Sequence, residues 1–230
     1  MTITLSPREA ARGLLLVVVT LAFLSVAGQF SRHVLGHDVL LGFVRQFNLD
    51  AEGNVPAWYA SMTLLLSAVL LGVIARTKHL ARAPYARHWG LLVLIFVGLS
   101  VDEAASLHEM AVHPLRALLH ARGVLYFAWV VPGAVFVLAV GLAYLRFLLH
   151  LPPAARRGFI VAGGLFVGGA LGMELAGGYV AHYHGEGTPL YTAMTTVEEC
   201  LEMLGIVVFI HALLSYLRME VGEVRIRFGD

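Results

Sequence analysis

Six long apolar stretches constrain what this chain can fold into. They cover approximately residues 13–30, 57–75, 88–109, 124–147, 158–181 and 194–217. Each approaches the roughly 20 residues that a helix needs to cross a bilayer. Backbone groups in lipid must pair within their own segment unless a β-barrel closes, and these runs lack the alternating polarity of barrel strands. The sequence therefore predicts an all-α polytopic membrane protein, a six-transmembrane-helix bundle that forms a single integral membrane domain over residues 1–230.

The overall composition excludes several protein classes. Hydrophobic residues make up 59% of the 230 residues and charged residues 13%, whereas an ordinary soluble domain is about a quarter charged. A soluble enzyme and a disordered chain are therefore excluded. The single cysteine, Cys200, rules out an internal disulfide or a CxxC redox pair. The net charge of +1 indicates no nucleic-acid partner, and membrane lipid is the expected partner instead.

Basic residues alternate between the connections. The N-terminal tail, the connections after the second and fourth apolar stretches and the C-terminal tail hold twelve of the sixteen Lys and Arg residues. Because positive residues are retained on the cytoplasmic side, both termini are predicted to be cytoplasmic, in a bacterial-type inner or plasma membrane. Arg8 and Arg12 before an apolar run resemble the start of a signal peptide. We interpret this segment as an uncleaved first helix.

Three local features complete the expected bundle. The connection over 30–57 is the longest on the outer side, and a short interfacial helix is expected in it around 40–47. Pro132 is expected to produce a kink or a local opening in the helix over 124–147. Gly164, Gly168 and Gly172 form a small-xxx-small stripe, which predicts the close approach of a helix partner or a second copy of the chain.

Several acids are expected deep within the spans. At 1.5 Å per residue, Asp102 and Glu103 lie roughly 20 Å from the cytoplasmic face, and Glu174 lies about 22 Å from it. The acids of the last helix lie roughly 5–10 Å below the outer face; they are Glu198, Glu199 and Glu202. These helices therefore bring their carboxylates to one level of a core about 30 Å thick. Carboxylates at one depth need protons or a bound cation to compensate them.

This residue set indicates a metal centre. Carboxylates and histidine from several helices form the ligand set of dinuclear iron or manganese centres, and hard oxygen ligands favour a divalent Fe, Mn or Zn ion. The usual Glu-x-x-His pair is absent, and Glu103 and His108, five residues apart, do not share a helix face. Asp102, Glu103 and Glu199 are the predicted catalytic residues. The predicted metal ligands are Asp102, Glu103, His108, Glu109, Glu174, His182, Glu198, Glu199 and Glu202.

Structural roles compete with this interpretation. Glu198 is also explained as an acid in a first helical turn, where the helix dipole favours it. Glu174, taken alone, is explained as a neutral buried acid with a hydrogen-bonding neighbour. His182 and His184 are typical loop histidines, although they are placed to fold over the acids.

The leading functional hypothesis is a membrane-embedded metal-dependent enzyme whose site lies in the extracytoplasmic half of the bundle. Its substrate would be a lipid or another amphipathic molecule, and its chemistry either metal-assisted hydrolysis or oxidation at a dinuclear centre. One alternative is a proton or cation carrier that uses the same acids. Another is an accessory subunit of a larger membrane complex.

Overall fold

The chain folds into long helices that stand side by side. A computed structural model describes residues 6–36 and 42–220, and every regular element within them is helical. Six helices are long and apolar enough to cross a membrane, which confirms the predicted number and is compatible with an integral membrane protein. They are α1 (Pro7–Leu35), α3 (Val55–Leu80), α4 (Ala86–Ala105), α6 (Val130–His150), the continuous helix Pro153–His184, and α9 (Pro189–Glu220).

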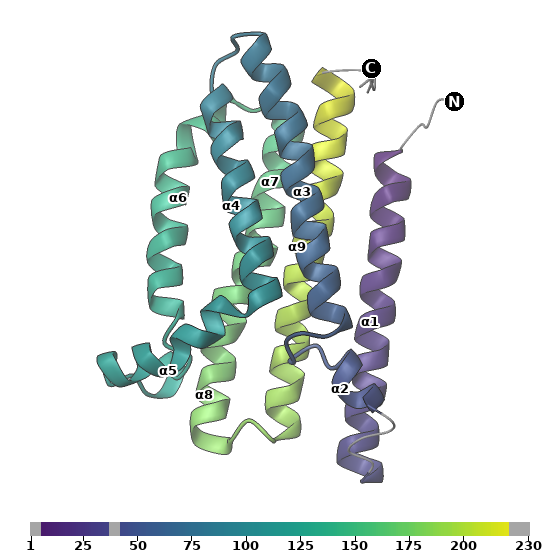
Figure 1. The fold of residues 1–230 in the computed structure, drawn as a ribbon, viewed down its shortest axis with the longest axis vertical. Coiled ribbons are helices and arrows are strands. Elements are labelled where there is room, and N and C mark those ends of the chain that lie inside the picture. Colours follow the sequence, from purple (N-terminus) through teal and green to yellow (C-terminus); the bar gives the residue numbers. More distant parts are fainter. Residues whose placement is uncertain (1–5, 37–41, 221–230) are drawn as a thin grey trace.

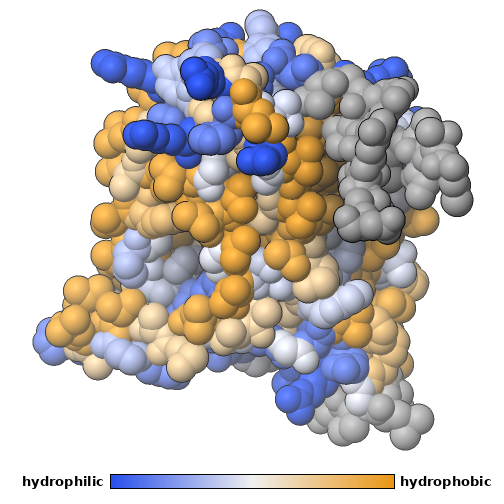
Figure 2. Space-filling model, turned by 45° about the horizontal axis from the view of Figure 1, so that its top comes forward, coloured by the Kyte–Doolittle hydropathy of each residue, from blue (hydrophilic) through white to orange (hydrophobic). Residues whose placement is uncertain are grey.

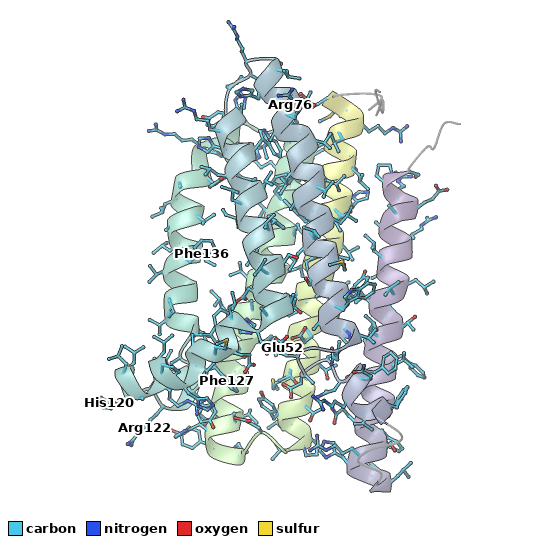
Figure 3. All side chains as sticks on the ribbon, in the orientation of Figure 1. Glu52, Arg76, His120, Arg122, Phe127 and Phe136 are labelled. Carbon is cyan, nitrogen blue, oxygen red and sulfur yellow. The ribbon has the colours of Figure 1, made fainter. Side chains whose placement is uncertain are left out.

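Both described ends of the chain lie at the same end of the bundle (Figure 1). We call this the termini end. The opposite end carries α5 (Leu107–Leu119), which runs across the direction of the long helices (Figure 1), and we call it the α5 end. Arg76 lies at the termini end, whereas Glu52, Phe127 and His120 lie at the α5 end (Figure 3).

Helix α9 is the centre of the bundle. It packs against α1, α3 and most of the helix Pro153–His184. The most apolar part of α9 is 56% buried within the protein, compared with 11% for α4 and α6. Helix α3 is 50% buried, whereas α1, α4, α6 and the helix Pro153–His184, at 11–17%, expose most of their apolar surface, as lipid-facing helices do (Figure 2).

Glycines allow the closest contact, between α7 (Pro153–Val167) and α9. A Cβ added at Gly205 would lie 2.8 Å from the backbone nitrogen of Phe166 and 2.9 Å from the carbonyl oxygen of Ala162. The expected stripe is not used in this way, because Cβ atoms added at Gly164, Gly168 and Gly172 would meet no other atom within 4 Å. Its use by a partner or a second copy of the chain stays a prediction.

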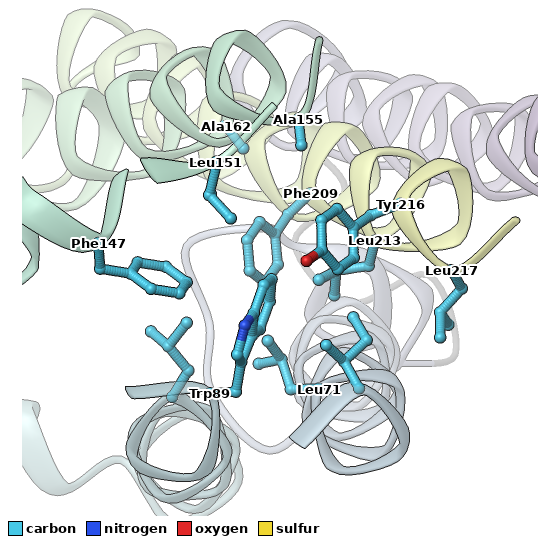
Figure 4. Packing of buried hydrophobic residues seen from close by; sticks show 12 residues of the cluster. Leu71, Trp89, Phe147, Leu151, Ala155, Ala162, Phe209, Leu213, Tyr216 and Leu217 are labelled. Atoms are coloured by element: carbon cyan, nitrogen blue, oxygen red, sulfur yellow. The ribbon is translucent and has the colours of Figure 1, made fainter. Parts of the chain in front are cut away.

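Aromatic side chains fill the termini end of the bundle. The indole of Trp89 on α4 is 2% exposed, and its ring centroid lies 5.0 Å from those of Phe147 and Tyr216 (Figure 4). The hydroxyl of Tyr144 donates a hydrogen bond of 2.9 Å to the carbonyl oxygen of His88. These contacts fasten α6 to α4 at the termini end.

The helix expected over 88–109 is two helices in the structure. Helix α4 ends at Ala105, and Ser106 adopts a left-handed conformation with φ of 53° before α5 begins. The Oδ1 atom of Asp102 accepts the backbone N–H of His108 at 2.9 Å. This bond satisfies a donor that would otherwise be unpaired at the start of α5, so the sharp change of direction is stabilised locally.

Other element boundaries also differ from the expectations. The helix expected over 124–147 begins with a 3₁₀ turn, η2 (Gly123–Leu125), and α6 starts only at Val130. A kink within α6 is absent, because Pro132 lies in its first turn, where an N–H has no partner within the helix. The expected helix is instead interrupted before this residue, over 126–129. The short helix expected around 40–47 is present as α2 (Phe43–Phe47); residues 40 and 41 lie outside the described residues.

Candidate functional site

One elongated cavity of about 610 Å³ lies between α4, α6, α7 and α9. Its volume is within the range of small-molecule sites. Toward the termini end its wall is apolar and includes Phe96, Phe136, Val140, Phe159 and Phe209. At the α5 end its wall is acidic. We call this part the acidic end, defined by Asp50, Glu52, Asp102, Glu103, His108, Glu109, Glu174, Glu198, Glu199 and Glu202.

The structure brings eight of the nine predicted ligands to this cavity. They come from α4, α5, α8 (Glu174–His184) and α9, so segments distant in the sequence meet at one level. The ninth, His182, does not line the cavity. It lies exposed in the last turn of α8, with its ring centroid 5.8 Å from that of Tyr126. The expectation that His182 and His184 fold over the acids is wrong, because α8 continues as a helix through both residues.

The break at Ser106 places His108 beside Asp102. The imidazole Nδ1 lies 2.9 Å from Asp102 Oδ2, and the ring centroid lies 4.9 Å from that of Trp129. In a continuous helix, residues 102 and 108 would not share a face. Because α4 ends at Ala105, His108 reaches Asp102, which it would not do in a helix that continued.

A second pair of acids meets between α8 and α9. The indole Nε1 of Trp129 donates a hydrogen bond of 2.6 Å to Glu174 Oε1, and Glu174 and Glu198 line the same cavity. Glu198 is 8% exposed, and its Oε2 has no hydrogen-bond partner among the described residues. A buried carboxylate oxygen without a partner is an available acceptor for a cation or a hydrogen-bond donor.

A π-helical turn, η3 (Gly168–Met173), precedes Glu174 directly. A Cβ added at Gly169 within it would lie 2.8 Å from the carbonyl oxygen of Glu198 and 2.8 Å from Glu202 Cγ. The absence of a side chain thus lets this turn lie directly against the acid-bearing segment of α9. Such π turns occur frequently at functional sites.

Two acids of the cavity, Asp50 and Glu52, were not among the predicted site residues. They lie between α2 and α3 in a segment that hydrogen bonds hold in place. The backbone N–H of Leu49 donates to Ser25 Oγ at 3.1 Å, and Asn54 Nδ2 donates to the carbonyl oxygen of Asn48 at 2.6 Å. The same Asn54 caps α3 by accepting the N–H of Ala57. In the sequence, Asn54 with Pro56 indicates that a helix starts here, which is the available sign that the preceding segment is held in place.

The electrostatic balance of the acidic end is one-sided. Among the described residues that line the cavity there are nine acids, and the one basic side chain is His108. Burial opposes its charged form, but the hydrogen bond to Asp102 and the charges of Asp102, Glu52 and Glu109 outweigh burial and raise the pKa of His108 to about 9. Burial also raises the pKa of Glu52. An imidazolium at neutral pH offsets only part of the negative charge.

We expect an Asp102→Asn substitution to lower the pKa of His108 from about 9 toward its ordinary value of about 6.5. The neutral amide keeps the size of the side chain but removes the charge that favours the imidazolium. The raised value also means that the stabilisation from this pair is complete below about pH 6.5 and is lost as the pH rises through about 9. Histidine-selective NMR titration of the metal-free protein measures the shift, with His108→Gln assigning the signal. An unchanged midpoint in the Asn variant would contradict the pairing.

Within residues 6–36 and 42–220, no three His, Cys, Asp or Glu side chains are arranged to hold a metal ion. The acids therefore face one cavity without forming a complete coordination shell, and the predicted divalent metal stays a prediction.

These features define the class of the protein: an all-helical chain with six helices that can span a membrane, around a cavity that is acidic at one end and apolar at the other. Over residues 11–217 the chain matches the model of a family described as a domain of unknown function (DUF8692), and it belongs to that family. No curated protein and no solved structure matches it.

Proposed function

We propose that this protein is a membrane-embedded enzyme that acts on a lipid or another amphipathic molecule at the acidic end of its cavity. One observation carries the proposal: titratable side chains and a long apolar wall belong to the same cavity. Apolar pockets with a few convergent polar groups are the usual form of a small-molecule site. The apolar wall supports binding of a tail, and the acids support chemistry at the head group.

The acids and the histidine are suited to proton transfer. Glu103 and Glu199 line the cavity and are the proposed general acid and base. Asp102 is hydrogen-bonded to His108, so its proposed role is to orient that imidazole and stabilise its charge. Hydrolysis is the reaction class that this set supports best, since it needs only water as a second reactant.

The sidedness follows from charge. Twelve of the sixteen basic residues belong to the tails and connections of the termini end, where Figure 3 places Arg76, whereas Arg122 lies at the α5 end. Because positive residues are retained on the cytoplasmic side, we propose that the termini end is cytoplasmic and that the acidic end lies in the extracytoplasmic half, in a bacterial-type inner or plasma membrane.

A divalent Fe, Mn or Zn ion is the proposed cofactor. The support for it is the excess of acids over basic groups around the cavity. The residues that would hold the metal ion are Glu103, Glu174, Glu198, Glu199 and Glu202. Since no three described side chains converge on one point, side-chain rotation must accompany binding, and no chemical step is assigned to the metal.

Lipid turnover together with elemental analysis tests the proposal. Wild-type protein and the double variant Glu103→Gln/Glu202→Gln are incubated with a membrane lipid extract, with and without added Fe, Mn or Zn, and products are followed by mass spectrometry. We expect the wild type to consume one lipid class and the variant to be slower by about 100-fold or more, the usual loss when acid–base groups are removed. Glu220→Gln, in an exposed ion pair with Lys78, is the matched control.

The outcomes separate the parts of the proposal. Near-stoichiometric metal in the wild type and its loss in the double variant would support the cofactor. Lipid turnover by metal-free protein would overturn the cofactor and leave the enzyme. If no lipid is consumed but proton or cation flux into liposomes depends on the same two acids, the enzyme is overturned and the carrier is supported.

A further inference from the structure

The cavity has the length of an extended hydrocarbon chain. Helix α6 contributes lining residues on successive turns from Gly133 to Leu148, and 15 residues of helix rise by about 22 Å. Gly141, Gly163 and Gly164 line it without side chains, and Cβ atoms added at any of them would meet no other atom within 4 Å. The apolar part is therefore a continuous slot, suited to one tail rather than to a compact ligand.

The cavity is reached sideways. At the termini end α4 and α6 are joined by the hydrogen bond from Tyr144 to the carbonyl oxygen of His88. At the α5 end the ring of His108, in the first turn of α5, neighbours that of Trp129, which directly precedes α6. Between these two contacts, Phe96 on α4 and Phe136 and Val140 on α6 line the cavity. Figure 2 shows hydrophilic atoms in a hollow of the otherwise apolar belt, on the face that carries α4 and α6. A membrane lipid meets this opening directly.

Helix α5 flanks the opening as an interfacial element. Its apolar residues Leu107, Met110 and Leu118 recur at helical spacing and are 47%, 70% and 74% exposed. Its polar residues Glu109, His113 and Arg116 recur at the same spacing on another face. An amphipathic helix of this kind lies in the head-group region of a bilayer, so the acidic end is placed at the depth of lipid head groups.

The chemistry of the acidic end selects the charge of the head group. It presents nine acids against one basic side chain, and Glu198 Oε2 is buried there without a hydrogen-bond partner among the described residues. The rings of Trp129, Tyr191 and Phe127 line the same region. An ammonium group supplies positive charge and three donors, and aromatic faces attract cations. A phosphate or carboxylate head would be repelled.

We propose that the cavity takes a single-chain amphipath with a positively charged amine head, which enters between α4 and α6 and places its amine at Glu198 and the neighbouring acids. This inference rests on the proposed function, because it names the substrate class of the same site. The tail contributes to binding whatever the head is, at about 0.8 kcal/mol per buried methylene. Ligands with equal tails therefore isolate the effect of the head.

Competition binding tests the inference. Radiolabelled hexadecylamine is bound to the purified full chain and displaced by unlabelled hexadecylamine, hexadecanol or palmitate. The amine is expected to compete at a concentration about tenfold lower than the alcohol, since a hydrogen bond to a charged group contributes about that factor. Palmitate is expected to be weaker still. Glu198→Gln should weaken the amine about tenfold and leave the alcohol unchanged.

The tail is tested by a second pair of variants. Gly141→Phe fills the slot and is expected to weaken all hexadecyl ligands at least tenfold. Gly98→Phe is the matched control, because Gly98 on α4 is exposed, lies outside the cavity wall and has no atom within 4 Å of an added Cβ. If alcohol and palmitate compete as well as the amine while Gly141→Phe weakens all three, the amine head is overturned and the proposed function stands. If Gly141→Phe changes the binding of none of the three ligands, the amine head and the proposed lipid-binding function are both overturned.

Discussion

Gly205→Leu is expected to prevent the bundle from assembling. The new Cβ would lie 2.8 Å from the backbone nitrogen of Phe166 and 2.9 Å from the carbonyl oxygen of Ala162. Both are backbone atoms of α7, which cannot rotate away as a side chain can, so α7 and α9 must separate. Overpacking costs about 3 kcal/mol or more where backbones must move, and α9 is the helix that most of the others contact.

Size-exclusion chromatography and thermal unfolding in detergent measure this effect. The Gly205→Leu protein should aggregate, or unfold at a much lower Tm than the wild type. The control is Gly98→Leu on α4, where an added Cβ meets no atom within 4 Å and no loss is expected. A Gly205→Leu protein with the elution volume and Tm of the wild type would show that α7 and α9 are not in contact at this residue.

The double variant Glu174→Gln/Glu198→Gln is expected to be more stable than the wild type and inactive. Both carboxyl groups line the cavity, and Glu198 Oε2 is buried without a hydrogen-bond partner among the described residues. Neutral amides of the same shape remove the cost of keeping like-charged groups together away from water, while a glutamine oxygen can still accept the Trp129 N–H. A gain of about 1–3 kcal/mol raises the Tm by roughly 2–4 °C per kcal/mol in a chain of this size.

This variant distinguishes a functional from a structural role. The Tm is measured in the presence of a chelator, so that a bound cation does not contribute to the stability of the wild type, and turnover is measured beside it. Glu220→Gln should alter neither quantity, because its ion pair with Lys78 is exposed. A lower Tm in the double variant would mean that the two acids hold α8 and α9 together, and a functional site at this pair would then be wrong.

The number and type of the helices could be predicted because hydropathy alone decides them. A span of about 20 apolar residues has one stable form in lipid, so the six long helices follow from six apolar runs. The level of the acids follows in the same way, because helical rise converts residue number into depth. Residues Glu103, Glu174 and Glu202 accordingly line one cavity.

The rest depends on contacts that are not periodic. Helix α4 ends where Asp102 accepts the N–H of His108. The spacing of residues in a continuous helix does not predict this hydrogen bond. Asp50 and Glu52 reach the cavity because Ser25 and Asn54 fasten their segment. Trp129 has the position of an interfacial tryptophan in the sequence, but its N–H is bonded to Glu174. The Ser25 and Trp129 contacts join residues 24 and 45 positions apart, and the Asp102 contact crosses the break between two helices, so helical spacing predicts none of them.

The central position of α9 has a consequence for biosynthesis. This helix follows the other five spans in chain order, so the ribosome delivers the centre of the bundle after its periphery. Synthesis proceeds at about 5–20 residues per second, and the roughly 80 residues between α4 and α9 therefore take on the order of ten seconds. During that time the acids of α4 lack the wall that α9 contributes to the cavity. We expect the insertion machinery to retain these spans until α9 arrives, and ribosome-bound chains that stop before Pro189 should crosslink to it.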